Sequence, residues 1–164
     1  MGSPVGSQSY CTTFWNKEVE DTSVPLLELV AKVPLVQDRL LLTRYCGVSR
    51  AGFMMRSTDP AATEEAAHLH DGAIQKVLQS MLPNSANGSI TNRMMKQAEL
   101  PLNQGGLGLT AAVGSGMRAY PAAFADAARN LTLEGAKTEG ELPTALKNFY
   151  HAKPQISNSG IVQD

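Results

Sequence analysis

The apolar positions of this chain recur mostly at the three- and four-residue intervals of helices. In residues 23–33 (SVPLLELVAKV), the leucines and valines lie at this spacing. Ser23 is placed as an N-cap and Pro25 falls in the first turn, where proline is well tolerated. Pro34 then ends the segment, because proline cannot continue a helix. The pattern predicts a first helix over this range.

A second helix is predicted over residues 35–47 (LVQDRLLLTRYCG), with Gly47 as its stop. A short segment restarts at Ser49. The apolar side of the second helix is expected to consist of Val36, Leu40, Leu41 and Tyr45.

The most regular pattern begins at Asp59, which is predicted to cap a long helix with Pro60 at its first position. Glu64 and Glu65 place negative charge near the positive end of its dipole. Its predicted apolar stripe consists of Ala62, Ala66, Leu69, Ala73 and Val77, widened by Ile74, Leu78 and Met81.

The C-terminal half continues in the same manner. A shorter helix is predicted over residues 90–100. After the glycines a further helix is predicted, and Pro121 inside it is expected to kink or divide it. Thr138 and Glu141 form a candidate capping box. The apolar face of the predicted helix that contains Pro121 consists of Val113, Met117, Tyr120, Phe124 and Leu131.

No hairpin signal or two-residue alternation interrupts these patterns. The sequence therefore predicts an all-α fold, a small bundle of about five to seven helices joined by short Gly/Pro loops. Residues 1–22 are predicted to form a loosely ordered N-terminal arm, residues 23–152 the helical domain and residues 153–164 a polar tail.

Composition narrows the class of protein. The 164 residues carry a net charge of −1, so no general attraction for polyanions is implied. Two cysteines cannot form a disulfide framework or a zinc site on their own. The longest aliphatic run, residues 40–42, is far too short to span a membrane. The opening MGSPVGSQS does not resemble a signal peptide, so we expect an intracellular protein of unspecified compartment.

The segment LPLNQGGLGLTAA, residues 100–112, raises the question of a nucleotide site. Its glycines match the G-x-G-x-x-G/A pattern of dinucleotide-binding proteins, but that chemistry needs a strand before the glycines, and a helix end precedes them here. We therefore interpret Gly105, Gly106 and Gly108 as a structural turn and expect no cofactor. Leu102, Leu107 and Leu109 are expected to fill the core beside the turn.

Four stretches follow one another along the chain: LLLTRYCGVSRAGFMMRSTDP, HLHDGAIQKVL, LPLNQGGLGLTAAV and RAYPAAFADAARNL. In this order they resemble segments of reverse-transcriptase-like proteins of the non-LTR retrotransposon type. The resemblance covers roughly residues 24–131. It implies a helical, thumb-like region that follows the catalytic palm of such proteins.

The palm itself has no counterpart in this chain. Its signature is a pair of adjacent aspartates that hold two metal ions, and this sequence has no Asp-Asp pair. No catalytic residue or metal ligand can therefore be carried over. The resemblance implies a non-catalytic helical piece without a small-molecule substrate.

A thumb-like piece would contact the phosphates of RNA or DNA through its cations. The candidates are Arg39, Arg44, Arg50 and Arg56, which follow one another without an intervening acid. The alternative is that these arginines form ion pairs with the acids upstream, Glu18, Glu20, Asp21 and Glu28.

Two other classes of function stay open. The leucine- and methionine-rich faces suit a helical protein–protein interaction module. A small enzyme would have to use His68, His70 and Asp71, although the two histidines point to different faces of a helix. Cys46 is expected to be a buried structural thiol. An exposed apolar patch would favour the interaction module, and a cleft that gathers the three polar side chains would favour the enzyme.

Overall fold

The computed structural model describes residues 2–82 and 90–133, with side chains up to residue 127. Within these ranges the chain is all-α and contains no strand, which confirms the predicted fold class. The α-helices are α1 (Gln8–Glu18), α2 (Val24–Ala31), α3 (Val36–Leu42), α4 (Val48–Ser57), α5 (Pro60–Met81), α6 (Asn92–Glu99) and α7 (Ala112–Leu133). The short turns are η1 (Val19–Ser23), η2 (Thr43–Gly47) and η3 (Leu102–Gln104).

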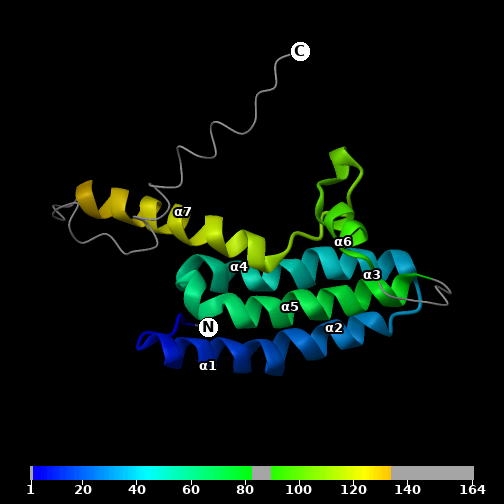
Figure 1. Cartoon of the computed structure of the whole chain (residues 1–164), viewed down its shortest axis with the longest axis horizontal. Coiled ribbons are helices and arrows are strands. Elements are labelled where there is room, and N and C mark those ends of the chain that lie inside the picture. Colours follow the sequence, from blue (N-terminus) through cyan, green and yellow to red (C-terminus); the bar gives the residue numbers. More distant parts are fainter. Residues whose placement is uncertain (1, 83–89, 134–164) are drawn as a thin grey trace, which may run out of the picture.

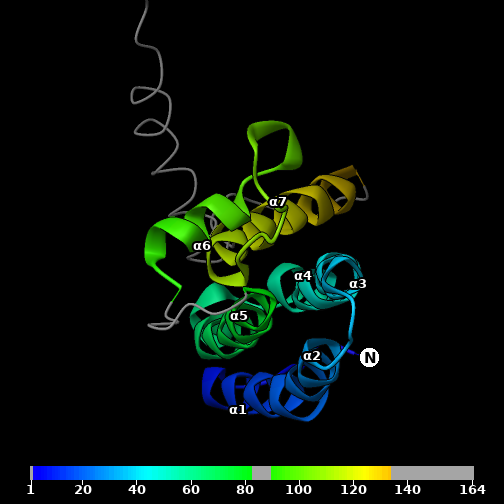
Figure 2. The ribbon, with the colours of Figure 1, turned by 90° about the vertical axis from the view of Figure 1, so that its right-hand side faces the viewer.

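The helices stack in three layers (Figures 1 and 2). The continuous rod of α1 and α2 forms one outer layer, α5 and the rod of α3 and α4 form the middle, and α6 and α7 cover the opposite side. Helix α5 contacts α1, α2, α4 and α7 and is therefore the central element. The C-terminal part of α7 extends past the ends of α4 and α5 (Figure 1).

Residues 8–18 form a helix, so the expectation of a loose arm over residues 1–22 is wrong. Ser7 caps α1 by accepting a hydrogen bond from the N–H of Tyr10. Trp15 is 3% exposed, and its indole N–H donates to the hydroxyl of Thr58 at 2.9 Å. The buried stripe consists of only Cys11, Trp15 and Val19, four residues apart in an otherwise polar segment. Tertiary contact with α5 orders this segment despite its weak local pattern.

Ser23 is not an N-cap, because α1 and α2 are one rod joined by a π-helical turn. The N–H of Val24 donates to the carbonyl of Val19, five residues earlier. The wider turn comes just before Pro25, whose ring would crowd the carbonyl four residues earlier in a regular α-helix. The chain thus continues the helix by locally changing its pitch.

Gly47 does not stop a helix either. It lies in the second π-helical turn with helical φ and ψ of −70° and −66°, and it is buried. A Cβ atom at Gly47 would lie 2.9 Å from Cδ2 of Leu27. The absent side chain therefore allows close contact with α2, which is a tertiary requirement that a sequence pattern does not reveal.

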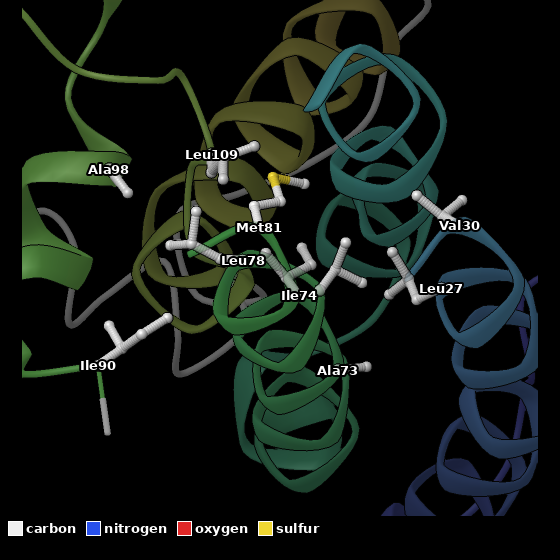
Figure 3. Close-up of a cluster of buried hydrophobic side chains, with 10 residues drawn as sticks. Leu27, Val30, Ala73, Ile74, Leu78, Met81, Ile90, Ala98 and Leu109 are labelled. Atoms are coloured by element: carbon white, nitrogen blue, oxygen red, sulfur yellow. The ribbon is translucent and has the colours of Figure 1, made fainter. Parts of the chain in front are cut away.

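Two buried clusters form the core. Figure 3 shows the larger one, in which side chains of α2 and α5 meet Leu109 of the glycine loop and Ala98 of α6. The second cluster joins α1, α4, α5 and the start of α7 around Trp15, Met54 and Met55. The long stripe predicted for α5 is buried as expected, apart from Leu69, which is 37% exposed.

The C-terminal expectations have different outcomes. Helix α6 forms within the predicted range, and α7 passes through Pro121 without being divided. The candidate capping box at Thr138 and Glu141, the end of the predicted domain and the polar tail over residues 153–164 lie outside the described residues. No helix in the described ranges combines the length and apolar character needed to cross a membrane.

Candidate functional site

The glycine loop folds back onto the C-terminal end of α6. Gly105 and Gly108 have positive φ angles of 76° and 70°, in the region that favours glycine. A Cβ atom on Gly106 would overlap the carbonyl group of Leu100. Each of the three glycines is therefore needed for the path of the backbone, although for different reasons.

The N–H groups of this loop are already used inside the protein. Those of Leu107 and Leu109 both donate to the carbonyl of Ala98 at 3.1 Å, and that of Gly108 donates to Leu100 at 2.9 Å. The N–H of Gly106 donates to the carbonyl of Pro101 at 3.1 Å. These bonds satisfy carbonyl groups that a helix end would otherwise leave unpaired. A phosphate would have to displace them, so the loop lacks the free donors of a nucleotide-binding loop.

The first turn of α7 is capped by an acid from α5. The two carboxylate oxygens of Asp71 accept hydrogen bonds from the N–H groups of Ala112 at 2.7 Å and Val113 at 3.1 Å. Negative charge at a helix N-terminus is stabilising, and here the protein supplies it itself. Sequence reasoning missed this role because Asp71 lies in the middle of a helix and caps a different one.

Arg44 approaches the same loop from η2. Its Nε atom lies 3.2 Å from the position that a Cβ on Gly108 would occupy. The guanidinium also stacks over the ring of Tyr45, 5.2 Å from the ring centre. Three stretches distant in sequence, containing Arg44, Asp71 and the glycines, therefore meet at one junction.

The outer side of the glycine loop differs in one respect from expectation. Leu109 is 1% exposed and Leu107 is partly buried against the core, but Leu102 is 56% exposed. Leu102 belongs to the short turn η3, which has no buried residue, so it does not fill the core.

His70 is buried beside this junction, with 1% of its surface exposed. Burial lowers its pKa; the neighbouring Asp71 opposes this shift and Arg50 adds to it. Neither ring nitrogen has a hydrogen-bond partner within the described ranges. Burial of His70 therefore favours its neutral form.

The three polar residues considered for an enzyme do not share a cleft. His68 is exposed, His70 is buried and the carboxylate of Asp71 is bound to the start of α7. Cys46 is exposed, contrary to expectation, whereas Cys11 is buried. No group of three or more His, Cys, Asp or Glu residues able to hold a metal ion occurs in the described part of the chain.

The four arginines have different surroundings. Arg39 clamps two chain segments, because its Nη1 donates to the carbonyl of Ser80 at 2.7 Å and its Nη2 to that of Pro34 at 3.3 Å. Arg44 is half-buried at the glycine loop, whereas Arg50 and Arg56 are exposed on α4. No acid among the described residues forms an ion pair with any of the four, so the alternative pairing with upstream acids is not observed there. Of these four arginines, only Arg50 and Arg56 are exposed.

Helix α3 has an apolar surface that no other residue in the described ranges covers. It has no buried residue, and most of its predicted apolar side faces outward; only Leu40 packs partly against the core. The exposed apolar residues of this surface, here called the α3 face, are Leu35, Leu41, Leu42 and Tyr45, with exposed fractions of 64%, 49%, 38% and 64%.

Comparison with known proteins adds no relative to this picture. No family model, no curated protein and no solved structure matches the chain.

Proposed function

We propose that this chain is a non-catalytic helical module of the reverse-transcriptase-like type, comparable to the region that follows the palm, and that it contacts a nucleic-acid backbone weakly. The resemblance rests on stretches containing Arg44, Asp71 and the three loop glycines. Their meeting at one junction supports the proposal, because the stretches then serve one structural purpose. The proposed family rests on the resemblance alone. The junction gives a physical role to the stretches that carry this resemblance.

The observation that carries the contact with nucleic acid is the exposure of Arg50 and Arg56 on α4 without an acidic partner among the described residues. The nearby carboxylate of Asp71 is engaged by two backbone N–H groups. Guanidinium groups in this state gain more from a phosphate than those already hydrogen-bonded, such as Arg39. Contacts of this type position a strand without reading its sequence.

The test is binding of labelled RNA and DNA at two salt concentrations, about 50 and 200 mM. We expect a dissociation constant of ~10⁻⁴–10⁻⁶ M for the wild type, the range of non-specific contacts. The variant R50Q/R56Q should bind less tightly, with a salt slope smaller by roughly 1.4 to 1.8. The control K17Q/K32Q removes the same charge from the α1–α2 rod, where both lysines are exposed. Equal binding by the two variants would contradict a role for α4.

A second candidate function, recognition of a partner helix, is favoured by the α3 face. Leu35, Leu42 and Tyr45 lie seven and three residues apart, at positions that share one side of a helix, and Asp38 occupies the remaining position of this seam. Exposed apolar residues at this spacing suit the apolar stripe of another helix.

The second candidate is tested by substitution on the α3 face. L35K/L41K should leave the fold intact and abolish association with an amphipathic helical peptide from a library selected on the wild type. The matched control L29K changes an exposed leucine of α2, 64% exposed, and should retain that association. If no peptide is selected, or if both variants bind equally, the α3 face is not a docking site.

A further inference from the structure

Helix α6 carries an open hollow that none of the predicted site residues lines. It has a volume of about 450 Å³ and is lined by Asn92, Arg93, Lys96, Gln97 and Leu100. These positions recur along one side of the helix. The opposite side faces the core through Ala98, which is 4% exposed, and Met95, which packs against the same cluster. The hollow therefore lies on the outward face of a well-anchored helix.

We propose that this hollow is a phosphate-contacting groove for a single nucleic-acid strand. The inference deepens the proposed function and rests on it. Arg93 and Lys96 supply two exposed positive charges three residues apart, close enough to act on the same strand. No acidic residue lines the hollow, and neither cation has a partner within the described ranges. A phosphodiester would be their first counter-charge.

The amide side chains add directional contacts. The Gln97 Nε2 group donates to the carbonyl of Gly105 at 2.9 Å, which fixes the side chain and leaves its carbonyl oxygen as an acceptor. Asn92 is exposed at the first position of the helix, beside the positive end of its dipole. Leu100 gives the hollow an apolar end against which a sugar or base can pack.

The glycine loop holds this groove in place. Its N–H groups bind the carbonyls of Ala98 and Leu100, so the last turn of α6 is tied to the loop. The start of the helix is capped by the hydroxyl of Thr91, which accepts from the N–H of Met94. Because both ends of this short helix are fixed, its backbone already holds the two cationic residues on one side of the helix, and binding loses less backbone entropy.

A strand is a better occupant than a free anion. The residues that line the hollow, from Asn92 to Leu100, span about two helical turns, and the two cations lie three residues apart among them. One phosphate can approach each cation while the sugar lies between them. No aromatic side chain lines the hollow, so base stacking is absent there and no sequence preference is expected.

The experiment compares the wild type, R93Q/K96Q and the control K17Q/K32Q, with fluorescently labelled single strands of RNA and DNA of twelve nucleotides. Because each phosphate contact on a single strand contributes about 0.7 to the salt slope, R93Q/K96Q should lower the slope by about 1.4. If the two proteins bind equally at about 1 M salt, this difference in slope corresponds to about 25-fold weaker binding of the variant at about 0.1 M salt. The control should stay within about twofold of the wild type, and all three proteins should unfold at the same temperature, because every substituted side chain is exposed.

The outcomes separate the two proposals. If the wild type binds neither strand at low salt, the proposed function fails and takes this inference with it. If the wild type binds and R93Q/K96Q matches it in affinity and slope, the groove is overturned while contact through α4 stands. If inorganic phosphate at the concentration of total nucleotide phosphate displaces the strand completely, the hollow binds free phosphate and the strand assignment is overturned. Selective weakening of R93Q/K96Q, resistant to that competition, supports it.

Discussion

The junction at the glycine loop and the α3 face represent opposite uses of polar and apolar groups. At the junction, four loop N–H groups, the carboxylate of Asp71 and the first N–H groups of α7 all have partners inside the protein. On the α3 face, large apolar side chains are exposed and no residue of the helix is buried. The comparison teaches that a glycine-rich motif can be fully engaged in structure while an ordinary leucine run is available for contact.

Among the substitutions at the junction, the largest effect should come from Gly106→Ala. The new Cβ would overlap the carbonyl of Leu100, and the loop would have to leave α6 to avoid it. We expect a loss of ~3 kcal/mol in the free energy of unfolding, measured with denaturant. The control Gly52→Ala should be neutral or stabilising by up to about 1 kcal/mol, because nothing lies within 4 Å of that position in α4. An unchanged free energy of unfolding for Gly106→Ala would contradict the close contact of the loop with Leu100.

Loss of the cap on α7 should be the next largest effect. Asp71→Ala removes both acceptors of the Ala112 and Val113 N–H groups and should cost about 1–2 kcal/mol. The matched control Asp38→Ala removes an exposed acid from the α3 face and should change stability by less than about 0.5 kcal/mol. If Asp71→Ala and Asp38→Ala lowered the free energy of unfolding equally, the junction and the α3 face would not differ in how they use their acidic residues. Thermal unfolding at neutral pH distinguishes these results.

The pH dependence of stability sharpens the comparison further. Burial lowers the pKa of His70, so below its ordinary value of 6.5 the unfolded chain takes up a proton that the folded protein does not. Stability is therefore fully present above pH 6.5 and falls as the pH decreases towards the folded pKa, by at most about 1.4 kcal/mol per pH unit. His70→Leu should flatten this dependence, whereas the exposed His68→Leu should retain it. Parallel unfolding curves from pH 7 to 5 for all three proteins would contradict the assignment.

The smallest effect is expected on the α3 face. Leu41→Lys should change the free energy of unfolding by less than about 0.5 kcal/mol, because the side chain is already 49% exposed. Leu27→Ala, at a position that is 1% exposed in α2, should cost about 2–5 kcal/mol in the same denaturant measurement. A large loss for Leu41→Lys would mean that the α3 face contributes to the core of the folded protein.

The sequence predicted the helices whose signals are local. Asp59 caps α5 by accepting a hydrogen bond from the N–H of Ala61, and Pro60 follows at the first position, as expected. The apolar stripe of α5 is long enough to be recognised above chance spacing, and the fold class follows from the repetition of such stripes. These features depend on neighbours within a few residues, so they can be read without a tertiary model.

The candidate site was predicted less completely. The sequence assigns the three glycines to a structural turn, and it singles out Arg39, Arg44, Arg50 and Arg56 by their charge. Which of them are exposed depends on where α5 and the glycine loop pack, since Ser80 engages Arg39 and Gly108 adjoins Arg44. The hollow on α6 was not found, because two cations in a short polar helix are an ordinary surface composition.

By itself, then, the sequence determined an all-α chain with a well-capped α5 and a glycine turn without the context of a nucleotide site. Tertiary structure alone decided that residues 8–18 are helical, that Gly47 lies against Leu27 and that Asp71 caps α7. The physical reason is the separation along the sequence of the residues that make each kind of contact. Caps and periodic stripes are set by contacts a few residues apart, whereas burial and close backbone approach are set by segments tens of residues apart, whose meeting no local pattern records.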